Sequence, residues 1–304
     1  TSSTGSFIQY YASTTGLSAG WGLDGFKTSS SGGVVTTYKP GAQTTPSSTI
    51  YAYYSIENKV SFYYGSSTSN VQRADLIGTY ISNMSTVPET GSVYVPLKTV
   101  FDTLTGHKWD AQYFSSGSSS TDQTAAFNTN IDLTLGSDYS YYAVYTRTLS
   151  AYSGFNKAQT HTFTQNYVTG GSTSTWTLPA GSMSGLSDFD WSRAGWRNGT
   201  SAGSSSITSY APGVTTNPST TICAVYSRTI TAYSGLNKAT THKGTQYYNS
   251  YNDEVYEVAI FDWENELYWM GFVNNPEFKF NISYKSTYIL NIFICQEKVF
   301  LFNS

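Results

Sequence analysis

The stretch TLSAYSGFNKAQTH at residues 148–161 returns as TITAYSGLNKATTH at residues 229–242, with ten of its fourteen positions identical. The residues before it repeat at the same offset of 81, as YAVYTR at 142–147 and CAVYSR at 223–228. Near-identity at one fixed spacing is typical of modules of a single kind that follow one another along the chain. The sequence therefore predicts a tandem array.

A third and earlier relative of these segments is TIYAYYS at residues 49–55, whose Tyr-Ala pair lies 91 residues before that of the second relative. A Tyr-x-Pro-Gly tetrad precedes two of the three segments, at residues 38–41 and 210–213. Pro fixes φ at the second position of a type II turn and Gly accepts positive φ at the third. We therefore expect each tetrad to form such a turn.

Residues 222–226, ICAVY, place apolar side chains on both faces of a strand, because successive side chains point to opposite sides. This pattern predicts a central strand. The first strand of the next module is expected around Thr229–Tyr233, only a few residues later. Adjacent modules would then be joined with almost no linker, and short joints favour a stiff rod.

The composition is polar without being charged. Ser and Thr make up 83 of the first 250 residues, of which only 24 are charged, while the chain carries 27 Tyr, 16 Phe and 7 Trp. β-branched and aromatic side chains suit a pleated sheet, so we expect a mainly β fold. A net charge of -3 without a basic run disfavours nucleic acid and anionic membranes as partners. No apolar run is long enough to span a membrane.

Tryptophans recur near one position of the predicted modules, at Trp21, Trp109 and Trp196. We interpret these three as core anchors and not as sugar-stacking platforms, because a buried aromatic removes about 150–250 Å² from water. Trp176 and Trp191 are less constrained by the pattern.

Four short motifs together resemble the Listeria-Bacteroides repeat, also called the internalin B-repeat, over about residues 1–250. They are Leu178-Pro179, Gly195-Trp196, Tyr210 with Gly213, and the closing segment 221–226. The resemblance implies small β-grasp-like modules with at most one short helix each, placed in tandem on bacterial surface proteins as spacers or adhesive segments.

We expect a partial first module at 1–58, a second at 59–147, a third at 148–228, and a diverged fourth module or terminal cap at 229–304. Both readings of the last part stay open, because its composition changes sharply after residue 250. Within it, residues 278–284 alternate like a half-buried strand. If the first module lacks its opening strand and the last carries a surplus one, head-to-tail strand exchange between copies becomes a hypothesis.

No catalytic, cofactor-binding or metal-binding residue is predicted. His107, His161 and His242 are isolated, and Cys223 and Cys295 have neither metal-ligand spacing nor the number needed for a disulfide framework. Two sets of acidic residues occupy alternate positions, and two pairs of adjacent Asn and Lys residues recur at corresponding sites. We interpret all of them as ordinary polar residues. They are Asp188 with Asp190, Asp262 with Glu264 and Glu266, Asn156-Lys157 and Asn237-Lys238.

The sequence therefore predicts a non-enzymatic extracellular or cell-surface structural protein, either a repeat stalk or adhesin segment or the subunit of an extracellular filament. The alternative is a carbohydrate- or host-receptor-binding module that uses exposed Tyr and Trp. Expected partners are other copies of the chain, assembled head to tail, or surface glycans and host proteins. The chain starts at Thr1 without a signal-peptide pattern, so we expect a processed product or a fragment.

Overall fold

The computed structural model describes residues 7–8, 12–38, 42–43, 49–201, 203, 206–218, 221–234, 236–252, 260–263, 266–272, 290–295 and 298–303. The chain is mainly β, as predicted. Its strands are β1 (Phe7–Ile8), β2 (Gly22–Lys27), β3 (Thr37–Tyr38), β4 (Tyr51–Tyr63), β5 (Val71–Ile81), β6 (Thr90–Val95), β7 (Asp110–Ser115), β8 (Thr129–Thr134), β9 (Tyr139–Ser153), β10 (Gln159–Val168), β11 (Trp176–Thr177), β12 (Ser192–Asn198), β13 (Ser209–Tyr210), β14 (Ile222–Ser234), β15 (Thr240–Asn249), β16 (Ile260–Trp263), β17 (Glu266–Phe272), β18 (Leu290–Cys295) and β19 (Lys298–Asn303).

Helical structure in the described residues is short. It comprises α1 (Lys98–Phe101) and the 3-10 turns η1 (Thr105–His107), η2 (Phe155–Lys157), η3 (Ser187–Phe189) and η4 (Leu236–Lys238). None of these helices has the length and apolar character needed to cross a bilayer.

The chain divides into two compact units. The first contains residues 1–146 and 166–173, and the second contains residues 147–165 and 174–304. Strands β9 and β10 therefore contribute residues to both units. The predicted module boundaries after residues 58, 147 and 228 stay predictions.

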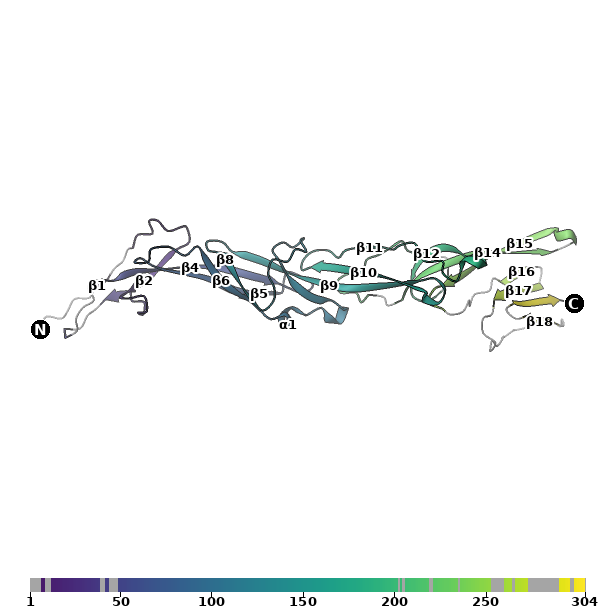
Figure 1. The fold of residues 1–304 in the computed structure, drawn as a ribbon, viewed down its shortest axis with the longest axis horizontal. Helices are drawn as coiled ribbons and strands as arrows, with labels where there is room; N and C mark the ends of the chain where they lie inside the picture. The colour runs from purple at the N-terminus through teal and green to yellow at the C-terminus, as the bar shows by residue number, and fades with distance from the viewer. Residues whose placement is uncertain are drawn as a thin grey trace. The chain divides into compact units, whose positions relative to one another are not determined.

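In the first unit, β4 is the central strand. It pairs antiparallel with β2 on one side and with β5 over the whole of β5, and β4 and β5 run side by side in Figure 1. Its last residues, 60–63, pair in parallel with residues 139–142 of β9, and β9 pairs antiparallel with β7. The sheet is therefore mixed.

In the second unit, β14 has the same role. It pairs antiparallel with β12 and with β15, and residues 222–223 pair in parallel with residues 151–152 of β9. Residues 222–226 are all buried, which confirms the predicted central strand with two apolar faces. The long β14–β15 hairpin is visible in Figure 1.

The antiparallel pairing of a short strand with a long one occurs three times, and each short strand has a bulge at the corresponding place. β2 is bulged between residues 23 and 25, β7 between 111 and 113, and β12 between 193 and 195. One residue beyond each bulge, an aromatic side chain lies opposite an alanine of the long strand. These pairs are Phe26 with Ala52, Phe114 with Ala143 and Trp196 with Ala224. The alanines are separated by the 91 and 81 residues of the sequence pattern.

This register corrects the alignment of the tryptophans. Trp191, and not Trp196, corresponds to Trp21 and Trp109, because each of these three directly precedes the bulged strand. The residue before each, Gly20, Lys108 or Asp190, has a positive φ. The residue with the left-handed conformation determines the direction in which the chain enters the strand. The spacing of tryptophans in the sequence does not reveal this feature.

Two further expectations differ from the structure. The strands predicted to close one module and to open the next are one continuous strand, since β14 runs through Ser227 and Arg228 without a turn residue. Gly213 does not have positive φ, so Pro212 and Gly213 are not the central residues of a type II turn. The turn lies after them instead, where the Thr216 amide donates to the Gly213 carbonyl at 3.2 Å.

Two other expectations cannot be compared with the structure. The Tyr-x-Pro-Gly tetrad at 38–41 lies mostly outside the described residues, and the predicted strand at 278–284 lies wholly outside them.

Candidate functional site: the seat of a hairpin tip

Three strand sets can be compared: β2, β4 and β5, then β7, β9 and β10, then β12, β14 and β15. Each set holds one tryptophan and two tyrosines whose rings are in contact. In every set the tyrosine of the return strand contacts both other rings. Its ring centroid lies 6.4, 5.9 or 5.8 Å from that of the tryptophan, in the pairs Tyr80–Trp21, Tyr167–Trp109 and Tyr248–Trp191. It lies 6.1, 6.0 or 6.0 Å from that of the long-strand tyrosine, in the pairs Tyr80–Tyr54, Tyr167–Tyr145 and Tyr248–Tyr226. Burial of these large rings stabilises each set.

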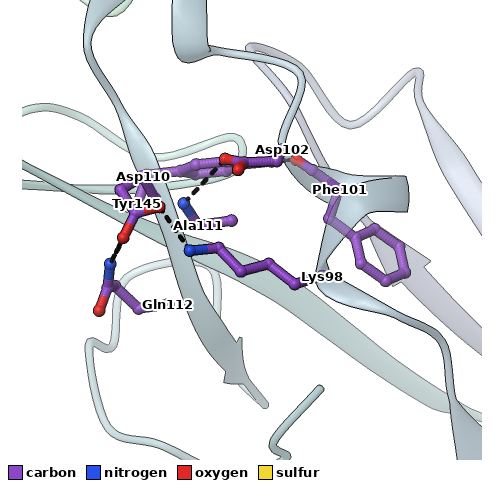
Figure 2. Close-up of polar contacts among 7 residues, drawn as sticks. All are labelled: Lys98, Phe101, Asp102, Asp110, Ala111, Gln112 and Tyr145. Atoms are coloured by element: carbon purple, nitrogen blue, oxygen red, sulfur yellow. Dashed lines mark hydrogen bonds and ion pairs between the residues drawn. The ribbon is translucent and has the colours of Figure 1, made fainter. Parts of the chain in front are cut away.

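The tyrosine of the long strand also fixes a loop through its hydroxyl group. Tyr145 accepts a hydrogen bond from the Gly65 amide at 2.8 Å and donates one to the Phe101 carbonyl at 2.8 Å. Figure 2 shows Tyr145 and Phe101 beside Asp102, whose carboxylate accepts from the Ala111 amide at 3.2 Å. Burial raises the pKa of Tyr145 to about 12, so its proton is retained as a donor.

The third set repeats this arrangement. Tyr226 accepts from the Gly154 amide at 2.7 Å and donates to the Ser182 carbonyl. Gly65 and Gly154 have φ values of 75° and 79°, a left-handed conformation that glycine adopts at little cost. Tyr145 and Tyr226 therefore each hold the glycine at which another hairpin begins to turn.

The hairpin between β9 and β10 ends in a tip, residues 152–157, that lies against β15. Asn156 and Lys157 have positive φ values of 47° and 57°. Their amides donate to the Tyr248 hydroxyl at 2.8 Å and to the Ser250 carbonyl at 2.7 Å. The Phe155 ring stacks on that of Tyr248, with centroids 5.7 Å apart.

Further contacts complete this surface. The Ser250 hydroxyl donates to the Tyr152 carbonyl at 2.7 Å, and the Tyr152 ring meets the edge of Tyr251 at 6.5 Å. The Lys157 ammonium lies 4.2 Å from the Tyr251 centroid, a cation–π geometry. We call the surface formed by Tyr248, Ser250 and Tyr251 the seat of the tip.

A related contact occurs in the first unit, at the hairpin between β4 and β5. The Thr169 hydroxyl donates to the Gly65 carbonyl at 3.2 Å. A Cβ atom on Gly170 would lie 2.7 Å from the Thr68 side chain, so the approach requires glycine there. Thr169 corresponds to Ser250, because both amides donate at 3.0 Å to the matching alanine of the long strand.

A buried polar pair holds a second loop. Arg147 donates to the Gln165 side chain at 2.8 Å, to the Thr216 carbonyl at 2.9 Å and to the Pro212 and Gly213 carbonyls at 3.1 Å. Burial lowers the pKa of Arg147. These hydrogen bonds give the Pro-Gly segment its conformation, which explains why a turn motif does not form a turn.

In the first set, Ile56 and Gly78 stand at the positions of Arg147 and Gln165, because each pair lies two residues from the clustered tyrosines on the two paired strands. A Cβ atom on Gly78 would lie 2.3 Å from the Leu135 side chain. Leu135 lies just after β8, in a segment that precedes β9 as the tetrad at 210–213 precedes β14, and it thus packs on an apolar pair. Each receiving pair matches the chemistry of its loop.

The residues weighed as candidates for chemistry are not brought together. Asp188 and Asp190 lie in and after η3, not at alternate positions of a strand, and both are exposed. Among residues whose side chains are described, no group of three His, Cys, Asp or Glu side chains has metal-binding geometry. The carboxylates at 262, 264 and 266 and the His242 ring lie outside these residues.

His161 has a partner that the sequence did not indicate. Its Nε2 lies 2.8 Å from the Ser153 hydroxyl, and its ring meets the edge of Trp196 at 5.5 Å. Ser153 is fully buried and accepts from the Ser182 amide at 3.0 Å. Burial lowers the pKa of His161. This pair packs the hairpin and presents no nucleophile to solvent.

A hollow of about 320 Å³ adjoins the third set, with Leu178, Trp196 and Tyr226 in its lining. Arg193 is the one charged residue among the lining residues, and its guanidinium donates to the Gly181 carbonyl. An acid–base pair is therefore not present in this lining.

The tryptophan interpretation is confirmed, since Trp21, Trp109 and Trp196 are buried, as are Trp176 and Trp191. Sequence reasoning missed the seat. The repeated segment carried a signal for it, because a Tyr-x-Ser/Thr pattern follows each long strand at Tyr80, Tyr167 and Tyr248.

No protein-family model, curated protein or solved structure matches this chain.

Proposed function

We propose that this protein is a non-enzymatic structural protein of the cell exterior, a stalk or adhesin segment or a filament subunit made of modules in series. The proposal takes the modules as 1–58, 59–147, 148–228 and 229–304, of the kind that the Listeria-Bacteroides resemblance implies. One observation carries it: a hairpin tip of one strand set is seated on the return strand of the next, with backbone amides and aromatic rings in defined contact.

The chemistry of the contacts supports a mechanical role. Exposed ion pairs contribute little to stability, and the three ion pairs found among the described residues are all exposed. The seat and the Arg147 pair instead use buried or partly buried hydrogen bonds and stacked rings, which salt weakens much less than it weakens exposed ion pairs. Such joints suit a protein that must transmit force between modules in a variable exterior medium.

Single-molecule force spectroscopy of the whole chain, held by its two ends, tests this role. Each strand set that unfolds should release roughly 80 residues and a contour length of about 29 nm at up to 3.6 Å per residue. We expect discrete force peaks with increments of about this size or of its multiples. Extension without peaks would contradict the proposal.

A further inference from the structure

The chain carries a second tip whose described residues have the backbone conformation of the seated one. The hairpin between β14 and β15 has the sequence YSGLNK at residues 233–238, against YSGFNK at 152–157. Asn237 and Lys238 have φ values of 55° and 63°, close to the 47° and 57° of their counterparts. Positive φ is unfavourable for residues other than glycine, so its presence at both tips marks one preformed shape.

This second tip is exposed. Leu236, at the position of Phe155, has 86% of its surface accessible, and Tyr233, at the position of Tyr152, has 55%. Their counterparts at the seated tip are only partly accessible. An apolar side chain that is almost fully exposed at the end of a preformed turn is a feature of surfaces that meet a partner.

The first strand set has a surface that corresponds to the seat. Among the described residues, no hairpin tip is found on it. The Ser82 amide donates to the Ala52 carbonyl at 3.0 Å, as the Ser250 amide does to the Ala224 carbonyl. Tyr80 therefore corresponds to Tyr248, and Met84 to Asn252.

The hydroxyl groups of these two tyrosines agree as well. That of Tyr80 donates to the Met84 carbonyl at 3.4 Å, as that of Tyr248 does to the Asn252 carbonyl at 2.6 Å. With its proton so directed, the Tyr80 oxygen can accept an amide, as the Tyr248 oxygen accepts that of Asn156. Ser82 is exposed, and Met84 has 46% of its surface accessible.

We infer that the Tyr233–Lys238 tip of one copy of this chain docks on Tyr80 and Ser82 of a second copy, beside Met84, whose carbonyl accepts the Tyr80 hydroxyl. Leu236 covers the Tyr80 ring, while the Asn237 and Lys238 amides donate to the Tyr80 hydroxyl and the Ser82 carbonyl. Every one of these contacts has a counterpart at the occupied seat. The inference rests on the proposed function, for which it names the partner and the surfaces.

The docking is heterologous, because the tip and the seat are different surfaces. A copy whose tip is engaged still offers its own seat, so association is open-ended unless the geometry closes a ring. The occupant is a second copy because Tyr80 and Ser82 supply the ring, the hydroxyl and the carbonyl that this turn meets at residues 248 and 250.

Sedimentation velocity of the whole chain from about 1 µM to 1 mM tests the inference with three variants. Leu236→Glu alters the tip, Met84→Glu alters the seat, and Ile77→Glu is the matched control, an exposed apolar residue of the first set outside the seat. We expect the wild type and the control to form growing oligomers. Each of the other two variants should associate at least 10-fold more weakly, and a 1:1 mixture of them should form dimers and nothing larger, since the tip of one and the seat of the other are intact.

Three results would overturn the inference: a wild type that stays monomeric at every concentration, association that survives Leu236→Glu or Met84→Glu, and a mixture that remains monomeric. Circular dichroism confirms that each variant is folded. A monomeric wild type that still gives discrete force peaks would refute this docking and leave the proposed function standing, so the two failures can be told apart.

Discussion

The long-strand tyrosines offer a matched set of hydroxyl deletions. Tyr145→Phe leaves the ring in place but removes the partner of the Gly65 amide and of the Phe101 carbonyl. A buried backbone group that loses its partner costs about 1–3 kcal/mol. We therefore expect a loss of about 2–4 kcal/mol in the free energy of unfolding of the first unit.

Tyr226→Phe should cost the second unit a similar amount, because its hydroxyl also joins one amide and one carbonyl. Tyr54 is the internal control. Its hydroxyl donates to the Ser13 carbonyl at 2.6 Å, and no amide that donates to it is found in the described part of the chain. Tyr54→Phe should therefore cost only about 1 kcal/mol.

Urea unfolding followed by fluorescence and circular dichroism measures all three variants. The reasoning is refuted if Tyr54→Phe destabilises as much as Tyr145→Phe, or if both Tyr145→Phe and Tyr226→Phe change the free energy of unfolding by less than about 0.5 kcal/mol.

Three more predictions concern single side chains that are buried or partly buried. Arg147→Met should destabilise by about 2–4 kcal/mol in the same urea assay, because it removes the donor to the Thr216 carbonyl and to the Gln165 side-chain oxygen, and one of two donors to the Pro212 and Gly213 carbonyls. The exposed Arg73→Met should change the free energy of unfolding by less than about 0.5 kcal/mol. Burial lowers the pKa of His161, so as the pH falls the unfolded state takes up a proton on this ring before the folded state does, and the free energy of unfolding should decrease below about pH 6.5. His161→Gln should reduce this dependence of stability on pH. An unchanged dependence would contradict the lowered pKa of His161. Burial raises the pKa of Cys223 to about 11 from 9.0, so in a Cys295→Ala background the native thiol should react with a disulfide reagent about 100-fold more slowly than the unfolded chain, and equal rates would show that it is accessible.

The sequence predicts the elements of this fold that depend on side-chain pattern. Apolar side chains on both faces of residues 222–226 are enough to identify a central strand, and the spacing of 81 residues matches the spacing of Ala143 and Ala224 in the strand pairing. In a chain with so few charged residues, the many large aromatic side chains are expected to form the core, and the tryptophans are buried as expected.

What the sequence does not predict depends on backbone conformation and distant contacts. A Pro-Gly pair indicates a turn, but the carbonyls of residues 212 and 213 accept hydrogen bonds from Arg147, which lies 65 residues before Pro212. Trp191 and Trp196 are equally good matches to Trp109 until the positive φ of Asp190 and the bulge fix the register.

The seat was hidden for the same reason. The recurring Tyr-x-Ser/Thr pattern marks its position, but only the structure shows that the Phe155 turn reaches Tyr248, 93 residues away.

The central claim is that one strand set, with one mode of pairing, recurs along this chain. Residue-resolved hydrogen exchange at the Thr169 and Ser250 amides tests it most directly, because both residues are fully buried and both amides donate at 3.0 Å to the corresponding alanine carbonyl. We predict that both amides exchange about 10³-fold or more slowly than in the unfolded chain. Protection of one amide together with free exchange of the other would contradict the claim.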